Sequence, residues 1–188
     1  MRKTLVEGKV QSQCLFCSYY TIAKTSKFTY KMWRPWSGTG EKVQAPNEFN
    51  GWRLIKLLDC INALYVDVDQ HNSHGEIDMQ RMAWDAIATL ERAHMPLPNV
   101  IVYTGRGIHL YWTLSEALPA AALPRWQACQ RALVKLLRGD PQSADVTRVL
   151  RMIGTTNSKA NNWKVTAEVV VPERYRFDEL ADAILPFT

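Results

Sequence analysis

The sequence predicts an α+β fold in which an antiparallel sheet has the ferredoxin-like order of elements. From Asn62 onward, hydrophobic runs with the period of a strand alternate with runs of helical period. Their order is strand, helix, strand, strand, helix, strand, which places two helices on one face of the sheet. A polar stretch with several Gly and Pro residues, 33–50, precedes this region and indicates a long loop. We therefore expect an N-terminal part, residues 1–61, and a sheet domain, residues 62–188.

Each element has its own local signal. Short runs rich in β-branched and aromatic residues predict the strands, and apolar residues on one helical face predict the helices. Pro96 and Pro98 end the first helix, and Gly139-Asp140-Pro141 ends the second. The predicted strands are 62–69, 99–104, 108–114 and 163–171, and the predicted helices are 75–94, 123–138 and 177–185.

Composition excludes a disordered or membrane-spanning chain. Hydrophobic residues make up 47% of the 188 residues, and no run approaches the roughly 20 apolar residues that cross a membrane. No apolar run follows the first residues, so we expect no secretory signal and a cytoplasmic protein. Residues 1–60 hold ten Lys or Arg and four Asp or Glu. This basic excess would attract a polyanion such as nucleic acid, although a solvated basic surface has the same composition.

The four cysteines do not predict a disulfide framework, because the chain is neither small nor rich in cysteine. A structural zinc would need Cys14 and Cys17 together with His71 and His74, two pairs with two-residue gaps. The pairs lie far apart in the sequence, so we do not expect zinc.

Two aspartates end the first predicted strand. Because side chains alternate along a strand, Asp67 and Asp69 share one face. Their carboxylates repel each other unless a cation lies beside them, and oxygen ligands suit Mg²⁺ or Mn²⁺. A strand that simply runs into a polar turn would show the same pair.

A glycine-flanked arginine connects the two central strands. The turn is Thr104-Gly105-Arg106-Gly107, and His109 follows on the face that carries the two aspartates. Glycines let the backbone approach a ligand, and exposed N–H groups with an arginine can hold phosphate. Because the helices cover the other face, we expect this face to be open.

An acidic residue and two arginines follow the second long helix. Asp145 precedes Arg148 and Arg151, and a Gly-Thr-Thr-Asn turn then leads to Lys159. The carboxylate could supply another metal ligand, and the planar guanidinium groups could bind phosphate oxygens in pairs. An exposed basic loop would have the same composition.

Together, these three motifs resemble those of the archaeo-eukaryotic primase superfamily, in particular the plasmid- and phage-encoded primase-polymerases. Asp67 and Asp69 match the family's D-x-D or D-x-E motif at a strand end. Residues 104–109 match its Ser-Gly-x-Gly-x-His-like motif, with Thr in place of Ser. Residues 145–157 match its third motif, although Ile153 stands where the family often has Pro. The resemblance covers residues 62–171.

The resemblance implies a template-dependent nucleotidyltransferase, a DNA primase or primase-polymerase that makes or extends primers for a plasmid, phage or other mobile element. The implied partners are a single-stranded DNA template, NTPs or dNTPs, and a helicase or other replication proteins. The family fold adds an N-terminal α/β lobe, for which residues 1–61 are the candidate. The resemblance assigns Asp67, Asp69 and Asp145 to two Mg²⁺ or Mn²⁺ ions, and it assigns the nucleotide phosphates to Thr104, Gly105, Arg106, Gly107, His109, Arg148, Arg151 and Lys159.

Two other functions fit parts of the pattern. A non-catalytic single-stranded nucleic-acid-binding module of the RNA-recognition type has the same sheet order but presents aromatic residues on its open face. A rolling-circle nickase would need paired metal-binding histidines, and His109 has no histidine two residues away.

Three tryptophans in a basic region could stack on unpaired template bases. They are Trp33, Trp36 and Trp52, interleaved with Lys and Arg. For Trp52 we favour packing in the core, as is common for large aromatic residues.

Overall fold

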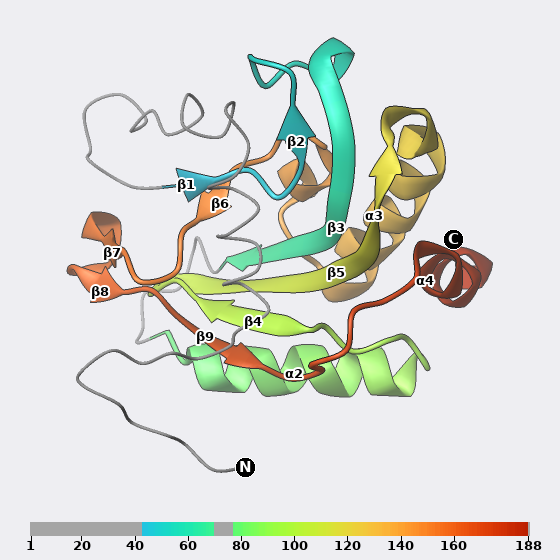
Figure 1. Cartoon of the computed structure of the whole chain (residues 1–188). Coiled ribbons are helices and arrows are strands. Elements are labelled where there is room, and N and C mark those ends of the chain that lie inside the picture. Colours follow the sequence, from blue (N-terminus) through green and yellow to red (C-terminus); the bar gives the residue numbers. More distant parts are fainter. Residues whose placement is uncertain (1–42, 70–76, 188) are drawn as a thin grey trace, which may run out of the picture.

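A five-stranded antiparallel sheet forms the centre of the structure (Figure 1). The computed structural model describes residues 43–69 and 77–187. The strands are β1 (Val43–Gln44), β2 (Glu48–Phe49), β3 (Leu58–Asp69), β4 (Val100–Tyr103), β5 (Gly107–Pro119), β6 (Leu150–Arg151), β7 (Thr156–Asn157), β8 (Trp163–Lys164) and β9 (Thr166–Val169). The described helices of more than one turn are α2 (Met79–Arg92), α3 (Leu123–Leu137) and α4 (Phe177–Ile184). The sheet has the order β2-β3-β5-β4-β9, while β1–β6 and β7–β8 form separate pairs.

The predicted elements occur in the predicted order, but one predicted strand is divided and two short strands that were not predicted, β6 and β7, precede it. Residues 163–171, predicted as one strand, form β8 and β9. β8 pairs with β7, whereas β9 joins the edge of the main sheet. The chain changes sheets at Val165, which is buried and bonded through its main chain to Gly154 and Thr155. Alternation of side chains predicted the strand character but not this change of partner.

The strand order differs from the ferredoxin-like order that we expected. In that order the last strand lies beside the first, whereas β9 pairs with β4. The edge of β3 beyond its short pairing with β2 is instead covered by α3 (Figure 1). Gln130 accepts from the Tyr65 N–H at 3.2 Å and donates to the Tyr65 carbonyl, and Trp126 Nε1 donates to Ala63 O at 2.9 Å. Because these side chains satisfy the edge, no strand is needed there.

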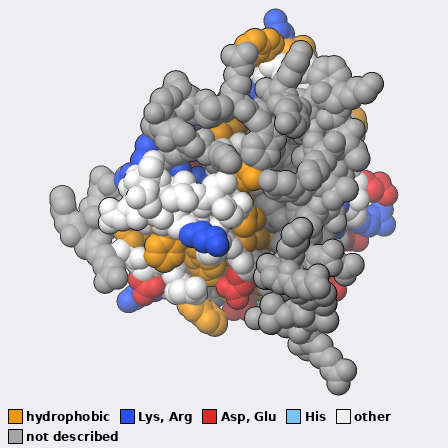
Figure 2. Space-filling view, turned by 60° about the vertical axis from the view of Figure 1, so that its left-hand side comes forward, with side chains coloured by type: hydrophobic (Ala, Val, Ile, Leu, Met, Phe, Trp, Pro, Cys, Tyr) orange, Lys and Arg blue, Asp and Glu red, His pale blue; other side chains and the backbone are white. Residues whose placement is uncertain are grey.

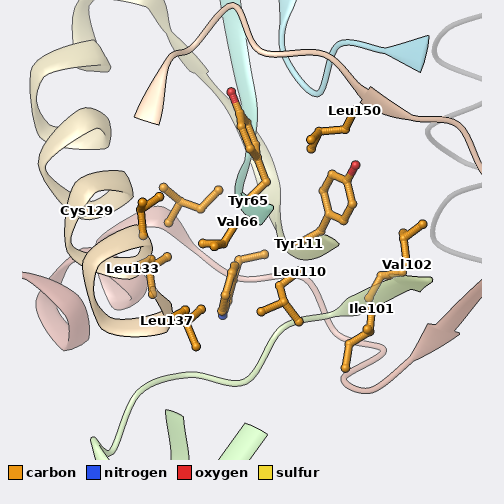
Figure 3. Close-up of a cluster of buried hydrophobic side chains, with 14 of the residues drawn as sticks. Tyr65, Val66, Ile101, Val102, Leu110, Tyr111, Cys129, Leu133, Leu137 and Leu150 are labelled. Atoms are coloured by element: carbon orange, nitrogen blue, oxygen red, sulfur yellow. The ribbon is translucent and has the colours of Figure 1, made fainter. Parts of the chain in front are cut away.

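Both faces of the sheet are covered, so the prediction of an open face was wrong. Figure 3 shows Val66 and Leu110 directed toward α3, and Tyr65 and Tyr111 directed to the other side, toward Leu150. Both tyrosines are 2% exposed or less. The cover comes from the segment after α3, whose apolar side chains can leave water only against this face. Its buried apolar members are Val146, Leu150, Met152 and Val165.

The described part of residues 1–61 belongs to the same body as the sheet. β2 pairs with β3 in the main sheet, and β1 pairs with β6. The rest of the expected N-terminal lobe, with Trp33 and Trp36, lies outside the described residues, so the boundary at residue 61 stays a prediction. The four candidate zinc ligands at positions 14, 17, 71 and 74 also lie outside them. None of the described helices has the length and apolar character needed to cross a bilayer.

Candidate active site

Asp67 and His109 face each other across the two central strands. They are direct partners in the antiparallel register of β3 and β5. The main chain of Asp67 is bonded away from β5: its N–H donates to Ser143 Oγ at 3.1 Å, and its C=O accepts from Asp140 at 2.7 Å. Opposed residues of this type have close side chains, and Asp67 Oδ1 lies 3.6 Å from His109 Nε2. The strand register therefore holds this pair together.

Arg148 links Asp67 to a second carboxylate, that of Asp140, which no sequence motif had marked. Arg148 Nη2 lies 3.1 Å from Asp67 Oδ2 and 2.6 Å from Asp140 Oδ2. Its Nη1 donates to Gln142 Oε1 at 2.6 Å. The three charged side chains are 15–22% exposed. One guanidinium thus offsets part of the repulsion between two partly buried carboxylates.

Asp140 reaches Asp67 because α3 ends against β3. Gly139 follows the helix, and its N–H donates to Val134 O at 2.9 Å. A Cβ at Gly139 would lie within 2.9 Å of the Asp67 carbonyl oxygen, a contact too close for any other residue. The Gly-Asp-Pro sequence predicted the end of the helix correctly. Its acidic residue could have been noticed as the first charged group after that end, but nothing in the sequence indicates that β3 passes beside it.

Asp145, the acidic residue that the third motif supplied, is directed elsewhere. Its carboxylate accepts from Thr147 N–H at 2.9 Å and from Thr147 Oγ1 at 2.8 Å, which closes a local turn. Its main-chain oxygen accepts from Tyr65 Oη at 2.7 Å. Among the described acidic, His and Cys side chains, neither Asp145 nor Asp140 joins Asp67 and Asp69 in a group whose ligand atoms all lie within 4.8 Å of one another.

A different acidic group does meet that spacing in the described residues. Glu48, Asp59 and Cys60 lie where β2 pairs with β3. Burial, and then the two neighbouring carboxylates, raise the pKa of the Cys60 thiol to about 11. Glu48 Oε1 also accepts from Asn62 Nδ2 at 3.2 Å, which ties β2 to β3 at this edge of the sheet.

His109 is buried and neutral. Its side chain is 5% exposed, and burial lowers its pKa below 6.5. The Asp67 carboxylate opposes this shift, whereas the charges of Arg151 and Arg148 add to it. Among the described residues, Nδ1 has no hydrogen-bond partner although it is buried. A buried ring nitrogen of this kind is costly unless a ligand or water reaches it.

The turn between β4 and β5 is tied to the third motif. Thr104 Oγ1 donates to Gly107 O at 2.9 Å, and Thr104 O accepts from Asn157 Nδ2 at 2.7 Å. Gly107 has to be glycine, since a Cβ there would lie 2.8 Å from Asp69 Cα. Asn157 is completely buried. The second and third motifs, far apart in the sequence, therefore form one connected structure.

The remaining predicted residues border this group. Asp69 pairs with Gly107 at the end of β3, next to the turn. Arg106 is half-buried in that turn, and Arg151 is half-buried in β6, where its charge acts on His109. Lys159 is exposed, and its N–H donates to the side chain of the buried asparagine of the third motif at 3.1 Å. The basic residues of the motifs thus surround the pair formed by β3 and β5.

A hollow of about 590 Å³ lies beside the same turn, between the start of α2 and β9. Its lining includes Met79, Tyr103 and Trp163. Figure 2, which brings the side of β7 and β8 forward, shows hydrophobic side chains gathered on this face, with acidic ones beside them. Strand alternation directs Tyr103 to the opposite face of the sheet from His109. The hollow is therefore separate from the group formed by Asp67, Asp140 and Arg148.

No protein-family model matches the chain. Two other comparisons, with protein sequences and with solved structures, each found a similar protein. A replication protein of Clostridium perfringens is 32% identical to it over 139 residues, which are 71% of this chain. The chain spans about a third, 33%, of the length of that relative.

The solved structure of a primase-polymerase domain from cyanophage S-2L has the same fold. It is described as an archaeo-eukaryotic primase domain, and it superposes with a TM-score of 0.60 at 19% identity. The match covers 77% of this chain and 70% of the cyanophage chain. This chain therefore has the fold of an archaeo-eukaryotic primase-type domain.

Proposed function

We propose that this chain is the catalytic domain of a primase-polymerase, a template-dependent nucleotidyltransferase that makes or extends primers. The observation that carries the proposal is the meeting of Asp67 and Asp140 at one cationic group, beside a buried histidine and a second arginine. The fold and the replication protein among its relatives support it. The mobile-element context, the cytoplasmic location, and a helicase or other replication proteins as partners are part of the same proposal.

The donor atoms fit a divalent metal ion. Asp67 and Asp140 place carboxylate oxygens within 3.1 Å of the same guanidinium nitrogen, so both face one position where positive charge is stabilised. Asp69 shares the strand face of Asp67. Hard oxygen ligands of this kind suit Mg²⁺ or Mn²⁺. We propose these three carboxylates as the ligands of the two ions, with Asp140 in the role that the third motif had given to Asp145.

Arg148 would then bind the two carboxylates in the absence of metal ions and the nucleotide in their presence. With the carboxylates committed to metal ions, its guanidinium would be released from them and could bind the nucleotide triphosphate bidentately. The orphaned Nδ1 of His109 is available to a phosphate oxygen in the same place. Arg151 adds positive charge beside it. The other proposed phosphate contacts are the Thr104-Gly105-Arg106-Gly107 turn and Lys159.

The chemistry needs little covalent participation by the protein. When bound, the metal ions lower the pKa of the attacking 3′-hydroxyl and neutralise charge on the leaving pyrophosphate. The residues of this chain hold the triphosphate in position and exclude water. In the neutral tautomer that carries its proton on Nδ1, His109 could donate one hydrogen bond to a phosphate oxygen without adding a charge to the site.

The test is primer extension on a single-stranded template with NTPs or dNTPs and Mg²⁺ or Mn²⁺. Asp67→Asn keeps the side-chain shape and should lower incorporation by roughly a hundredfold or more while the melting temperature changes little. Asp85→Asn, at an exposed position on α2, is the matched control. Mn²⁺ binding followed by electron paramagnetic resonance gives a second measurement.

A non-catalytic single-stranded nucleic-acid-binding module is the alternative function. It would bind template without incorporating nucleotide, even in the wild-type protein, and Asp67→Asn would leave template binding unchanged. Wild-type incorporation by that variant would refute the proposed site.

A further inference from the structure

Three large apolar side chains are exposed at the tip of the loop between β2 and β3. Trp52 is 69% exposed, Leu54 46% and Ile55 56%. The prediction that Trp52 packs in the core was therefore wrong. Clusters of exposed apolar side chains commonly mark a binding surface. We call these three residues the Trp52 tip.

The Trp52 tip has a defined shape. Asn50 N–H donates to Leu57 O at 2.7 Å across its base, and Leu54 N–H donates to Trp52 O at 2.8 Å within it. Gly51, with φ of 101°, makes the turn that leads into the tip. A large aromatic side chain held on an ordered loop loses little conformational entropy when it binds a partner.

The same loop is attached to the segment that carries Arg148. Arg53 Nη1 donates to the carbonyl of Thr147, the residue before Arg148 in the chain. Asn47, ahead of the loop, donates through Nδ2 to Val146 O at 3.2 Å and accepts from Asn62 N–H at 3.0 Å. The Trp52 tip is therefore tied to the segment that carries Arg148, although it precedes the start of β3 and Asp67 lies near the end of that strand (Figure 1).

The charged side chains at the Trp52 tip itself are cations, while the acidic Glu48 and Asp59 lie at the base of the same loop. Arg53 and Lys56 alternate with the apolar residues, and both are exposed. Unpaired bases present flat apolar faces between phosphates, and proteins bind them with aromatic side chains interleaved with Lys and Arg. An apolar protein partner would not need the cations.

We propose that the Trp52 tip is a stacking platform for an unpaired base of the template strand, with Arg53 and Lys56 near its phosphates. The partner's identity as template rests on the proposed function, while the binding site itself does not require catalysis. The tip would hold a template base at the end of β3 opposite to Asp67. Duplexes, whose bases are already stacked, gain nothing from it.

The test compares two exposed tryptophans. Trp52→Ala and Trp84→Ala remove side chains of similar exposure, 69% and 72%, from the loop and from the outer face of α2. Binding of fluorescein-labelled oligo(dT), oligo(rU) and a DNA duplex is measured by anisotropy in EDTA without nucleotide. Trp52→Ala should weaken single-strand binding by roughly tenfold, and Trp52→Phe should restore most of it. Trp84→Ala should bind as the wild type does.

Several outcomes would overturn the platform. They are unchanged single-strand binding by Trp52→Ala, equal losses in both Ala variants, or an equal loss for duplex and single strand. A lower melting temperature of Trp52→Ala together with failed rescue by Phe would show that the side chain packs against its own chain instead. The binding assay contains no metal or nucleotide, so its result does not depend on catalysis. A protein that incorporates no nucleotide but still binds single strands through Trp52 would refute the proposed function and leave the platform standing.

Discussion

The central strands and the segment after α3 position their functional residues in different ways. In β3 and β5, a continuous ladder holds Asp67 opposite His109. In the segment after α3, single contacts do the same work: Gly139 passes over β3, and Asn157 donates to the Thr104 carbonyl. Ladder positions follow from side-chain alternation, whereas each position in the segment depends on one side chain or one close approach. The segment should therefore be more sensitive to individual substitutions.

The largest expected effect separates two acidic residues of that segment. Asp140→Asn should lower nucleotide incorporation by roughly a hundredfold, because Asp140 shares a cationic position with Asp67. Asp145→Asn should lower nucleotide incorporation only a few-fold, since the carboxylate of Asp145 closes a turn with Thr147. Primer extension and Mn²⁺ affinity, measured on both variants, check this. The reverse ranking would return the third metal ligand to Asp145.

The second largest expected effect concerns stability. It tests whether Gln130 of α3 satisfies the edge of β3 in place of β9. Gln130→Leu should lower the free energy of unfolding by about 3 kcal/mol, because it leaves buried main-chain groups of Tyr65 and the Ser143 carbonyl without partners. Gln127→Leu makes the same change on the same helix and is the control, since no hydrogen bond of Gln127 is seen among the described residues. Urea unfolding measures both. Equal stability of the two variants would show that the helix covers this edge without needing the amide.

The strand pattern predicted β3, β4 and β5, because alternation of side chains is a local property. For the same reason it predicted that Asp67 and His109 lie on one face of the sheet. It did not predict that α3 would take the edge of β3, since that depends on one glutamine and one tryptophan on a helix. The cover over the His109 face was missed for a related reason. Its apolar residues, such as Val146 and Leu150, are scattered among charged ones and have no period. Asp140 was missed because its role depends on where the helix ends in space.

A smaller effect is expected when arginine chemistry changes but charge does not. Replacing Arg148 and Arg151 together by Lys should raise the KM for nucleotide several-fold, because an ammonium cannot bind two phosphate oxygens in the planar fashion of a guanidinium. Steady-state kinetics at saturating template measure it. Arg131→Lys, at an exposed position of α3, is the control. An unchanged KM in the double variant would mean that the two arginines serve the structure alone.

The smallest effect is the pH dependence that buried His109 gives to stability. Burial lowers its pKa in the folded state, so below about pH 6.5 the unfolded chain binds a proton that the folded chain does not. Stability contributed by this residue is therefore complete above that pH and falls as the pH is lowered through it. His109→Gln removes the titration without leaving a large cavity, and its unfolding free energy should lose this part of the slope between pH 7 and pH 5. If His109→Gln retained the wild-type slope, the acid sensitivity would come from another group and His109 would have to be accessible to water. The ladder of β3 and β5 would then hold the backbone of His109 in place without enclosing its imidazole ring. The contrast between the central strands and the segment after α3 would weaken.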